Sequence, residues 1–123
     1  MQQFEVVLLQ SDPRVAESLV SILTQSLGSV HEVNSVGELR RTIAKHRAKV
    51  AILDMEKASL SEVHHLAEEF PAASIVCTHR CADEEMWAAA LNAGAVDVCT
   101  ANDARAIIRA ARDSKPQQHK AAA

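Results

Sequence analysis

Short apolar runs alternate with segments of helical periodicity along most of the chain. The runs are compact and rich in Val, Ile and Leu, which is typical of buried strands. We expect five of them, at residues 4–9, 30–33, 50–53, 74–77 and 95–99. The segments between them place apolar residues on one helical face, as Val15, Leu19 and Ile22 do at four- and three-residue spacings. The pattern therefore predicts five strands, each followed by a helix.

The expected helices have recognisable start and stop residues. Asp12 and Pro13 suit the N-cap and the first position of a helix, and Gly28 suits its end. Residues 35–38 and 59–62 have the composition of capping boxes, and Pro71 closes the second of these helices. The last two helices are expected at residues 83–93, before Gly94, and from residues 102–103 to about 112.

This alternation constrains the topology. Strands joined by helical crossovers are parallel, and right-handed crossovers place helices on both faces of the sheet. We therefore predict an α/β fold, a three-layer, doubly wound sandwich around a five-stranded parallel sheet, in one domain over residues 1–113. Residues 114–123 are polar and then rich in Ala, and we expect a flexible tail or the start of a linker.

Length, charge and cysteine content narrow the function classes. The 123 residues suit a single domain, and 48% apolar residues argue against disorder. A net charge of −3 without a basic cluster gives no support for direct nucleic-acid binding. Apolar runs of six residues or fewer and the absence of a leader pattern predict no membrane span and no secretion. Three irregularly spaced cysteines do not predict a disulfide framework, so we expect a cytoplasmic location.

Aromatic residues are scarce. Phe4, Phe70 and Trp87 are the only ones, and there is no Tyr, whereas Ala occurs 22 times. A core built from Val, Ile, Leu and Ala is expected. Stacking surfaces for bases or flat cofactors would be few, which argues against single-stranded nucleic-acid binding and against a flavin.

The candidate chemistry lies where predicted strands end, the place at which doubly wound folds bind ligands. Asp54 closes the third strand and Thr78 the fourth, so a phosphoryl group or a cation would have room between them. With the stretches VVLLQSDP, VAILDM and AGAVD, this arrangement resembles the receiver domain of two-component response regulators over residues 4–112. The resemblance implies the flavodoxin-like receiver topology.

The resemblance also implies roles for particular residues. Asp54 matches the aspartate that accepts a phosphoryl group from a histidine kinase, and Thr78 matches the hydroxyl that contacts the phosphate. The two acids that bind Mg²⁺ in the family are replaced by Gln10 and Ser11. The family's Lys-Pro is replaced by Ala101 and the residue after it.

The aromatic switch residue of the family's fifth strand, often Tyr, is Val98 here, and the Phe that often follows the Lys-Pro is Asp103. Because Mg²⁺ requires carboxylate oxygens and phosphoryl transfer relies on the metal, at most weak Mg²⁺ binding at Asp54 is expected and no other cofactor.

The mouth of this expected site carries further departures from the family. Asp12 is the expected N-cap and so turns toward the first helix. The loop from residue 55, which contains Glu56, is about two residues shorter than usual. His79 replaces the small residue that normally leaves the phosphate accessible, and Arg80 follows it. These side chains either narrow the pocket or, for Arg80, supply a replacement cation.

Other chemistry-bearing residues have simpler explanations. Cys77, His79 and Cys81 suggest a metal site, but a fourth ligand at zinc spacing is missing. Cys77 and Cys99 are better explained as small buried residues on adjacent strands, and residues 64–65 as solvent-facing histidines. Trp87 is either a packing residue or an exposed anchor for a partner.

The sequence thus favours a degenerate receiver-like domain that is not an enzyme and that regulates by protein interaction. Its output would pass through the fourth helix, fifth strand and fifth helix. Partners would be a signalling protein, an attached output domain, a histidine kinase or a second copy. A working phosphoacceptor at Asp54 is one alternative. A small flavodoxin-like enzyme or cofactor carrier is another, against which stand the missing Gly-rich phosphate loop and the few aromatics.

Overall fold

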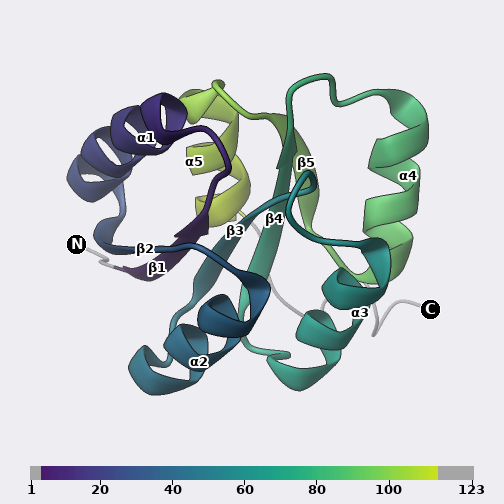
Figure 1. Ribbon diagram of the computed structural model, residues 1–123, viewed down its shortest axis with the longest axis horizontal. Helices are drawn as coiled ribbons and strands as arrows, with labels where there is room; N and C mark the ends of the chain where they lie inside the picture. The colour runs from purple at the N-terminus through teal and green to yellow at the C-terminus, as the bar shows by residue number, and fades with distance from the viewer. Residues whose placement is uncertain (1–3, 114–123) are drawn as a thin grey trace.

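The computed structural model describes residues 4–113, and the expected tail lies outside the described residues. Within this range, strands and helices alternate strictly, each strand being followed by a helix (Figure 1). The elements are β1 (Phe4–Leu9), α1 (Pro13–Ser26), β2 (Gly28–Val33), α2 (Val36–His46), β3 (Val50–Asp54), α3 (Leu60–Glu69), β4 (Ser74–His79), α4 (Glu84–Ala93), β5 (Asp97–Thr100) and α5 (Ala104–Asp113).

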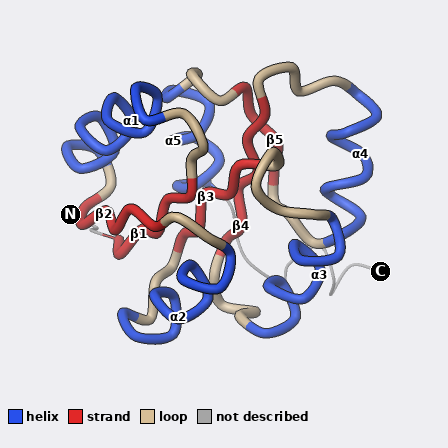
Figure 2. The backbone as a smooth tube through the Cα atoms, in the orientation of Figure 1, coloured by secondary structure: helices blue, strands red, loops and turns tan. Residues whose placement is uncertain are grey.

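All five strands pair in parallel, in the order β2-β1-β3-β4-β5. Figure 2 shows the strands at the centre with helices on both sides. Residues of α1 and α5 pack on one face of the sheet, and residues of α2, α3 and α4 pack on the other. The predicted three-layer, flavodoxin-like sandwich is thereby confirmed.

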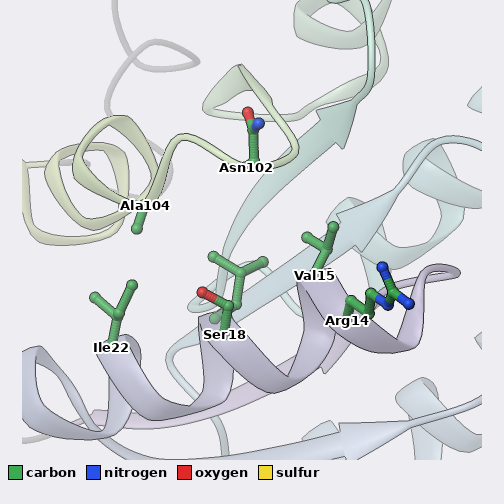
Figure 3. A pocket seen from close by; sticks show the side chains of 7 residues that line it. Arg14, Val15, Ser18, Ile22, Asn102 and Ala104 are labelled. Carbon is green, nitrogen blue, oxygen red and sulfur yellow. The ribbon is translucent and has the colours of Figure 1, made fainter.

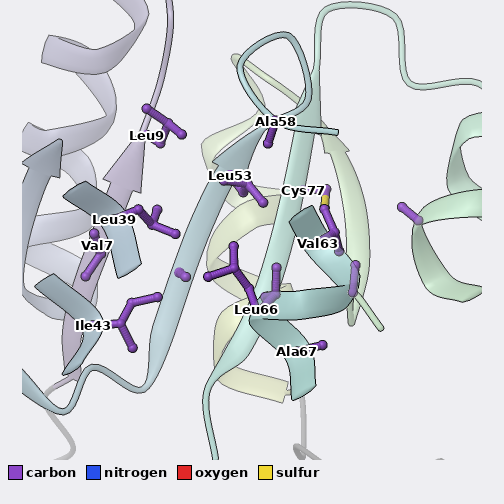
Figure 4. Close-up of a cluster of buried hydrophobic side chains, with 14 of the residues drawn as sticks. Val7, Leu9, Leu39, Ile43, Leu53, Ala58, Val63, Leu66, Ala67 and Cys77 are labelled. Atoms are coloured by element: carbon purple, nitrogen blue, oxygen red, sulfur yellow. The ribbon is translucent and has the colours of Figure 1, made fainter. Parts of the chain in front are cut away.

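Two aliphatic cores fill the space between the layers. Alternate residues of each strand point to opposite faces, so Leu8 and Ile52 enter the core under α1 and α5, whereas Val7 and Leu53 enter the other. Figure 4 shows the second core, in which α2 and α3 contribute Leu39, Ile43, Val63 and Leu66. No aromatic side chain is fully buried in either core within residues 4–113, as the composition predicts.

The predicted N-caps form. Asp12, Ser35 and Asp83 each accept a backbone N–H from the first turn of their helix, and Asp103 does so for α5. Ser59 and Glu62 complete a capping box. These local bonds fix where each helix starts and so where each preceding loop lies. Within the described range, no helix has both the length and the apolar character needed to cross a bilayer.

Strand boundaries differ from the expected ones. β2 begins at Gly28, two residues before the expected start. Helix α1 ends before this glycine, as expected, but Gly28, with a φ of +138°, is already the first residue of the strand. β5 begins late, at Asp97, because the N–H of Ala95 is used by the end of α4, where it donates to the Ala90 carbonyl. β3 extends through Asp54 and β4 through His79, so Asp54 and Thr78 lie within strands and pair in register.

Candidate functional site

Asp54 is the last residue of β3 and is 1% exposed. Both of its carboxylate oxygens accept backbone N–H groups: Oδ2 from Ser11 and Oδ1 from Glu56, each at 2.9 Å. Its own carbonyl accepts the N–H of Lys57, which closes the turn after the strand. Among the ion pairs of residues 4–113, none involves Asp54. The carboxylate is therefore held by the backbones of two loops.

The loop after β1 contributes Gln10, Ser11 and Asp12. The Gln10 side-chain oxygen Oε1 accepts the N–H of Asp12 at 3.0 Å and the Ser11 hydroxyl at 3.4 Å. The Asp12 carboxylate accepts the N–H of Arg14 and caps α1. The Gln10 amide oxygen and one oxygen of the Asp12 carboxylate thus already serve the loop itself or the helix that follows.

This donor set is poor in the ligands that Mg²⁺ prefers. The ion takes near-octahedral oxygen ligands and is usually bound through one or two carboxylates, with water at the other positions. Here Asp54 offers one carboxylate, both oxygens of which bind backbone N–H groups, and Gln10 offers an amide oxygen that accepts two hydrogen bonds.

Two buried polar atoms on either side of Asp54 have no hydrogen-bond partner among the described residues. They are Nε2 of Gln10, which follows β1, and the hydroxyl Oγ1 of Thr78 on β4. β1 and β4 are the two strands that pair with β3. Buried donors without partners are uncommon, and each costs about 1–3 kcal/mol. The two groups would satisfy their hydrogen-bonding capacity with an acceptor placed between the loops.

Two of the mouth residues, Arg80 and Glu56, form an ion pair. Arg80 Nε contacts Glu56 Oε2 at 2.8 Å, which joins the loop after β4 to the loop after β3. The Arg80 side chain is 78% exposed. His79 accepts the N–H of Cys81 through Nδ1. Arg80 is therefore bound to an acid at the rim instead of neutralising Asp54.

On β5 and after it, small aliphatic side chains occupy the remaining positions of interest. Ala101 is buried, and its N–H donates to the His79 carbonyl. Val98 is buried in the core that contains Leu53 and Cys77. Asp103 caps α5. Neither Ala101 nor Val98 brings a polar group toward Asp54.

The cysteines of the suggested Cys77, His79 and Cys81 metal site differ in burial. Cys77 and Cys99 are buried in different cores, and Cys81 is exposed. Burial raises the pKa of the Cys77 thiol to about 12, with Cys99 as a smaller cause. Burial, followed by the nearby Asp97 and Asp103 carboxylates, raises the pKa of Cys99 to about 12. The adjacent histidines of α3 are exposed, as expected.

Trp87 on α4 is exposed, at 46% of its surface, and its indole N–H donates to Asp97 Oδ1 at 3.1 Å. It thus joins α4 to the start of β5 while nearly half of its surface stays exposed. Packing at an edge and exposure to a partner, the two alternatives for this residue, are both compatible with this position.

Two other features of the structure have no signal in the sequence. One is a hollow of about 240 Å³ between α1 and the segment that enters α5 (Figure 3), lined by Arg14, Val15, Ser18, Leu19, Ile22, Asn102 and Ala104. The other is a cluster of Glu5, His31 and His46. Asp54 does not line the hollow, and the cluster lies on other elements, so both are separate from the region described above.

No protein-family model matches the sequence, and no curated protein does. Solved structures match well. A CheY-like protein, TadZ, from Pseudomonas aeruginosa is 25% identical, with a TM-score of 0.70, over 94% of this chain and 98% of that one. A LuxR-family two-component response regulator from Aurantimonas is 18% identical, with a TM-score of 0.76, over 88% of this chain and 81% of that one.

A response regulator from Burkholderia pseudomallei, solved with a phosphorylated aspartic acid, a calcium ion and citrate, is 16% identical. The match has a TM-score of 0.77 and covers 89% of this chain and 66% of that one. TM-scores of 0.70 to 0.77 show that the fold is the same, whereas sequence identities of 25% or less leave the chemistry open. The chain therefore has the fold of response regulator receiver domains.

Proposed function

We propose that the chain is a receiver-like regulatory module of a bacterial-type two-component system, which acts by protein interaction and in which Mg²⁺-dependent phosphorylation is impaired or absent. One observation carries the proposal. The Asp54 carboxylate, at the position of the phosphoacceptor, is bound through both oxygens by the N–H groups of Ser11 and Glu56. Gln10 and Ser11 stand where metal-binding acids are expected.

The electrostatics support this reading. Phosphoryl transfer to a carboxylate brings negative charge next to negative charge, so metal ions and fixed cations must neutralise it. Among the described residues, Asp54 has no ion-pair partner, Ala101 stands in the place of the lysine, and Arg80 is paired with Glu56. A module of this kind would bind its partner without a phosphorylation cycle, and it would not be an enzyme.

The exposed Trp87 gives the proposal a candidate output surface. Its ring lies on α4 beside the start of β5, and large exposed aromatics are frequent energetic centres of protein interfaces. The occupant would be a signalling protein, an attached output domain or a second copy of the chain. The regulator from Burkholderia pseudomallei extends beyond the matched region, which fits an arrangement with further domains.

The decisive experiment is incubation of the chain with acetyl phosphate and Mg²⁺, or with a histidine kinase, followed by intact-mass measurement. We expect no stoichiometric gain of about 80 Da, the mass of one phosphoryl group. The matched variant Q10D/S11D/A101K restores the acids and the lysine and is expected to gain that mass. A stoichiometric gain in the unchanged protein that is lost in Asp54→Ala would overturn the proposal.

A working phosphoacceptor is the second candidate, favoured by the two unpartnered donors beside Asp54. The Thr78 hydroxyl and the Gln10 amide nitrogen would donate to phosphoryl oxygens and so replace part of the missing positive charge. If this candidate is correct, the unchanged chain gains mass, and Thr78→Ala slows the gain. Under the first proposal, Thr78→Ala has no phosphorylation to slow.

A further inference from the structure

Three potential metal ligands meet between α2 and the first two strands, far along the sheet from Asp54. They are Glu5 on β1, His31 on β2 and His46, the last residue of α2. One ligating atom from each lies within 4.8 Å of the other two. His31 Nε2 and Glu5 Oε1 are 2.7 Å apart, and the rings of His31 and His46 stack with centroids 3.9 Å apart.

The fold itself gathers these side chains. β1 and β2 pair so that Val7 lies opposite His31, and Glu5, two residues before Val7, points to the same face of the sheet. That face is covered by α2, whose Ile43 enters the core. His46 follows Ile43 by three residues and so lies on the same side of the helix. α2 packs against both strands (Figure 1).

We propose that Glu5, His31 and His46 bind a divalent transition-metal ion of the Zn²⁺ type. Two imidazoles and one carboxylate are a donor set that Zn²⁺ takes in proteins, with bonds of about 2.0–2.2 Å. Two donors on one ion are then at most about 4.4 Å apart. That limit applies to donors on opposite sides of the ion, whereas tetrahedral donors are about 3.4 Å apart. The ligating atoms, which lie within 4.8 Å of one another, must therefore move by up to about 1.4 Å relative to each other.

Binding requires two local changes, and the exposure of the side chains permits them. Ring nitrogens coordinate in the plane of the ring, so the stacked rings, now inclined by 15°, must tilt until their nitrogens converge. The metal also replaces the hydrogen bond between His31 and Glu5. A proton on the coordinating nitrogen moves to the other ring nitrogen or to solvent. All three residues are half-buried, so the site stays open on one side, where water completes the coordination.

A purely structural role is the competing explanation. The Glu5–His31 pair and the ring stack would then only fasten β2 and α2 to β1, and the protein would not respond to metal. The other adjacent histidine pair provides the matched control. His64 and His65 are exposed on α3, with ring centroids 6.1 Å apart and no carboxylate shared between them. Removing either pair takes the same number of imidazoles from a chain that has six histidines.

The experiment titrates the full chain with Zn²⁺ by calorimetry and with Co²⁺ by visible absorption. We expect one tight equivalent in the unchanged protein and d–d bands of a low-coordinate Co²⁺ site. H31A/H46A should weaken the affinity by roughly 100-fold or more, since even outer-shell partners are worth 10–100-fold. H64A/H65A and Asp54→Asn should leave it unchanged, which separates this site from the region around Asp54.

Glu5→Gln guards against a folding defect in the double variant, because the amide can still accept the hydrogen bond from His31. We expect it to retain the fold, shown by circular dichroism, and to weaken Zn²⁺ binding by roughly tenfold. The proposal is overturned if the unchanged protein binds no Zn²⁺ in the micromolar range. It is equally overturned if H64A/H65A removes the binding and H31A/H46A does not.

Discussion

At the carboxyl end of the sheet, the polar group of interest is held by backbone, whereas toward the amino end the polar groups contact one another through side chains. Asp54 accepts two backbone N–H groups and is almost fully buried. Glu5, His31 and His46 are half-buried, and their contacts are an ion pair and a ring stack. Side-chain contacts rearrange by rotation about single bonds, but contacts to backbone move only with their loops.

Position in a fold and capacity for chemistry are therefore separate properties. The carboxyl end occupies the usual ligand position of a doubly wound sheet, yet its Asp54 carboxylate is bound through both oxygens by backbone N–H groups. The amino end is not a usual ligand position of this fold, but it brings together side chains that can ligate metals. Variants and chemical labelling can test whether the region around Asp54 is closed and whether the pairing of β1 with β2 holds the cluster of Glu5, His31 and His46 together.

The largest effect is expected in thiol reactivity, which tests whether the carboxyl end is closed. Cys77 precedes Thr78 inside the core, and Cys81 lies in the exposed loop above it. Raising the pKa of a thiol from 9.0 to about 12 lowers its thiolate fraction by about 1,000-fold near neutral pH. A thiol reagent should therefore label one cysteine quickly, and Cys81→Ser should abolish the fast phase. Rapid labelling of two or three cysteines would show that this end opens.

The raised pKa values of the two buried thiols predict that the folded protein loses stability at alkaline pH. The pKa values of Cys77 and Cys99 are higher in the folded protein than in the unfolded chain. The stabilisation from their neutral form is complete below the unfolded value near pH 9, and it is lost as the pH rises toward 12. Urea unfolding measured between these limits should show the decline, and C77A/C99A should show less of it. An equal decline in that variant would assign it to other groups.

Gly28→Ala should lower the unfolding free energy by about 3 kcal/mol, because it disturbs the amino end of the sheet. A Cβ there would lie 2.4 Å from the Phe4 carbonyl oxygen, and the φ of +138° is unfavourable for alanine. Because β2 would shift against β1, His31 should also separate from Glu5. Gly37→Ala is the control: its Cβ meets only ordinary contacts in α2, so a gain of about 0.5 kcal/mol is expected. Urea unfolding measures both, and equal effects would contradict the argument.

Asp54→Ala should destabilise the carboxyl end by about 2 kcal/mol, because the N–H groups of Ser11 and Glu56 lose their acceptor. Asp54→Asn retains one oxygen and should cost about half as much. Both are measured by denaturant titration. In a site crowded with acids, removing the aspartate would relieve repulsion and stabilise the protein, so a gain in stability would argue against a carboxylate held by backbone.

The smallest effect is expected from the Glu5–His31 pair without metal. Both side chains are partly exposed, 42% and 29%, so solvent screens the interaction. Glu5→Gln should lower the unfolding free energy by less than about 1 kcal/mol in the presence of a chelator. Added Zn²⁺ should then raise the melting temperature of the unchanged protein more than that of the variant. Identical shifts in the two proteins would remove the link between metal binding and this pair.

Local signals along the chain account for the secondary-structure elements and their order. Apolar runs, N-cap residues and the Ser59–Glu62 capping box act over a few residues, so their structural outcome could be derived from the chain alone. The position of Asp54 at the end of β3 followed in the same way. Strand ends do not follow from local signals, because they depend on which neighbour uses each N–H, as the N–H of Ala95 shows.

The surroundings of these residues depend on contacts between distant parts of the chain. The bond from the N–H of Ser11 to Asp54 joins positions that are 43 residues apart, and it requires the loops after β1 and β3 to lie side by side. The meeting of Glu5, His31 and His46 depends on the register between β1 and β2 and on how α2 rests on them. Register and helix packing are set by the fit of whole apolar faces. Local spacing along the chain therefore cannot reveal which polar side chains that fit brings together.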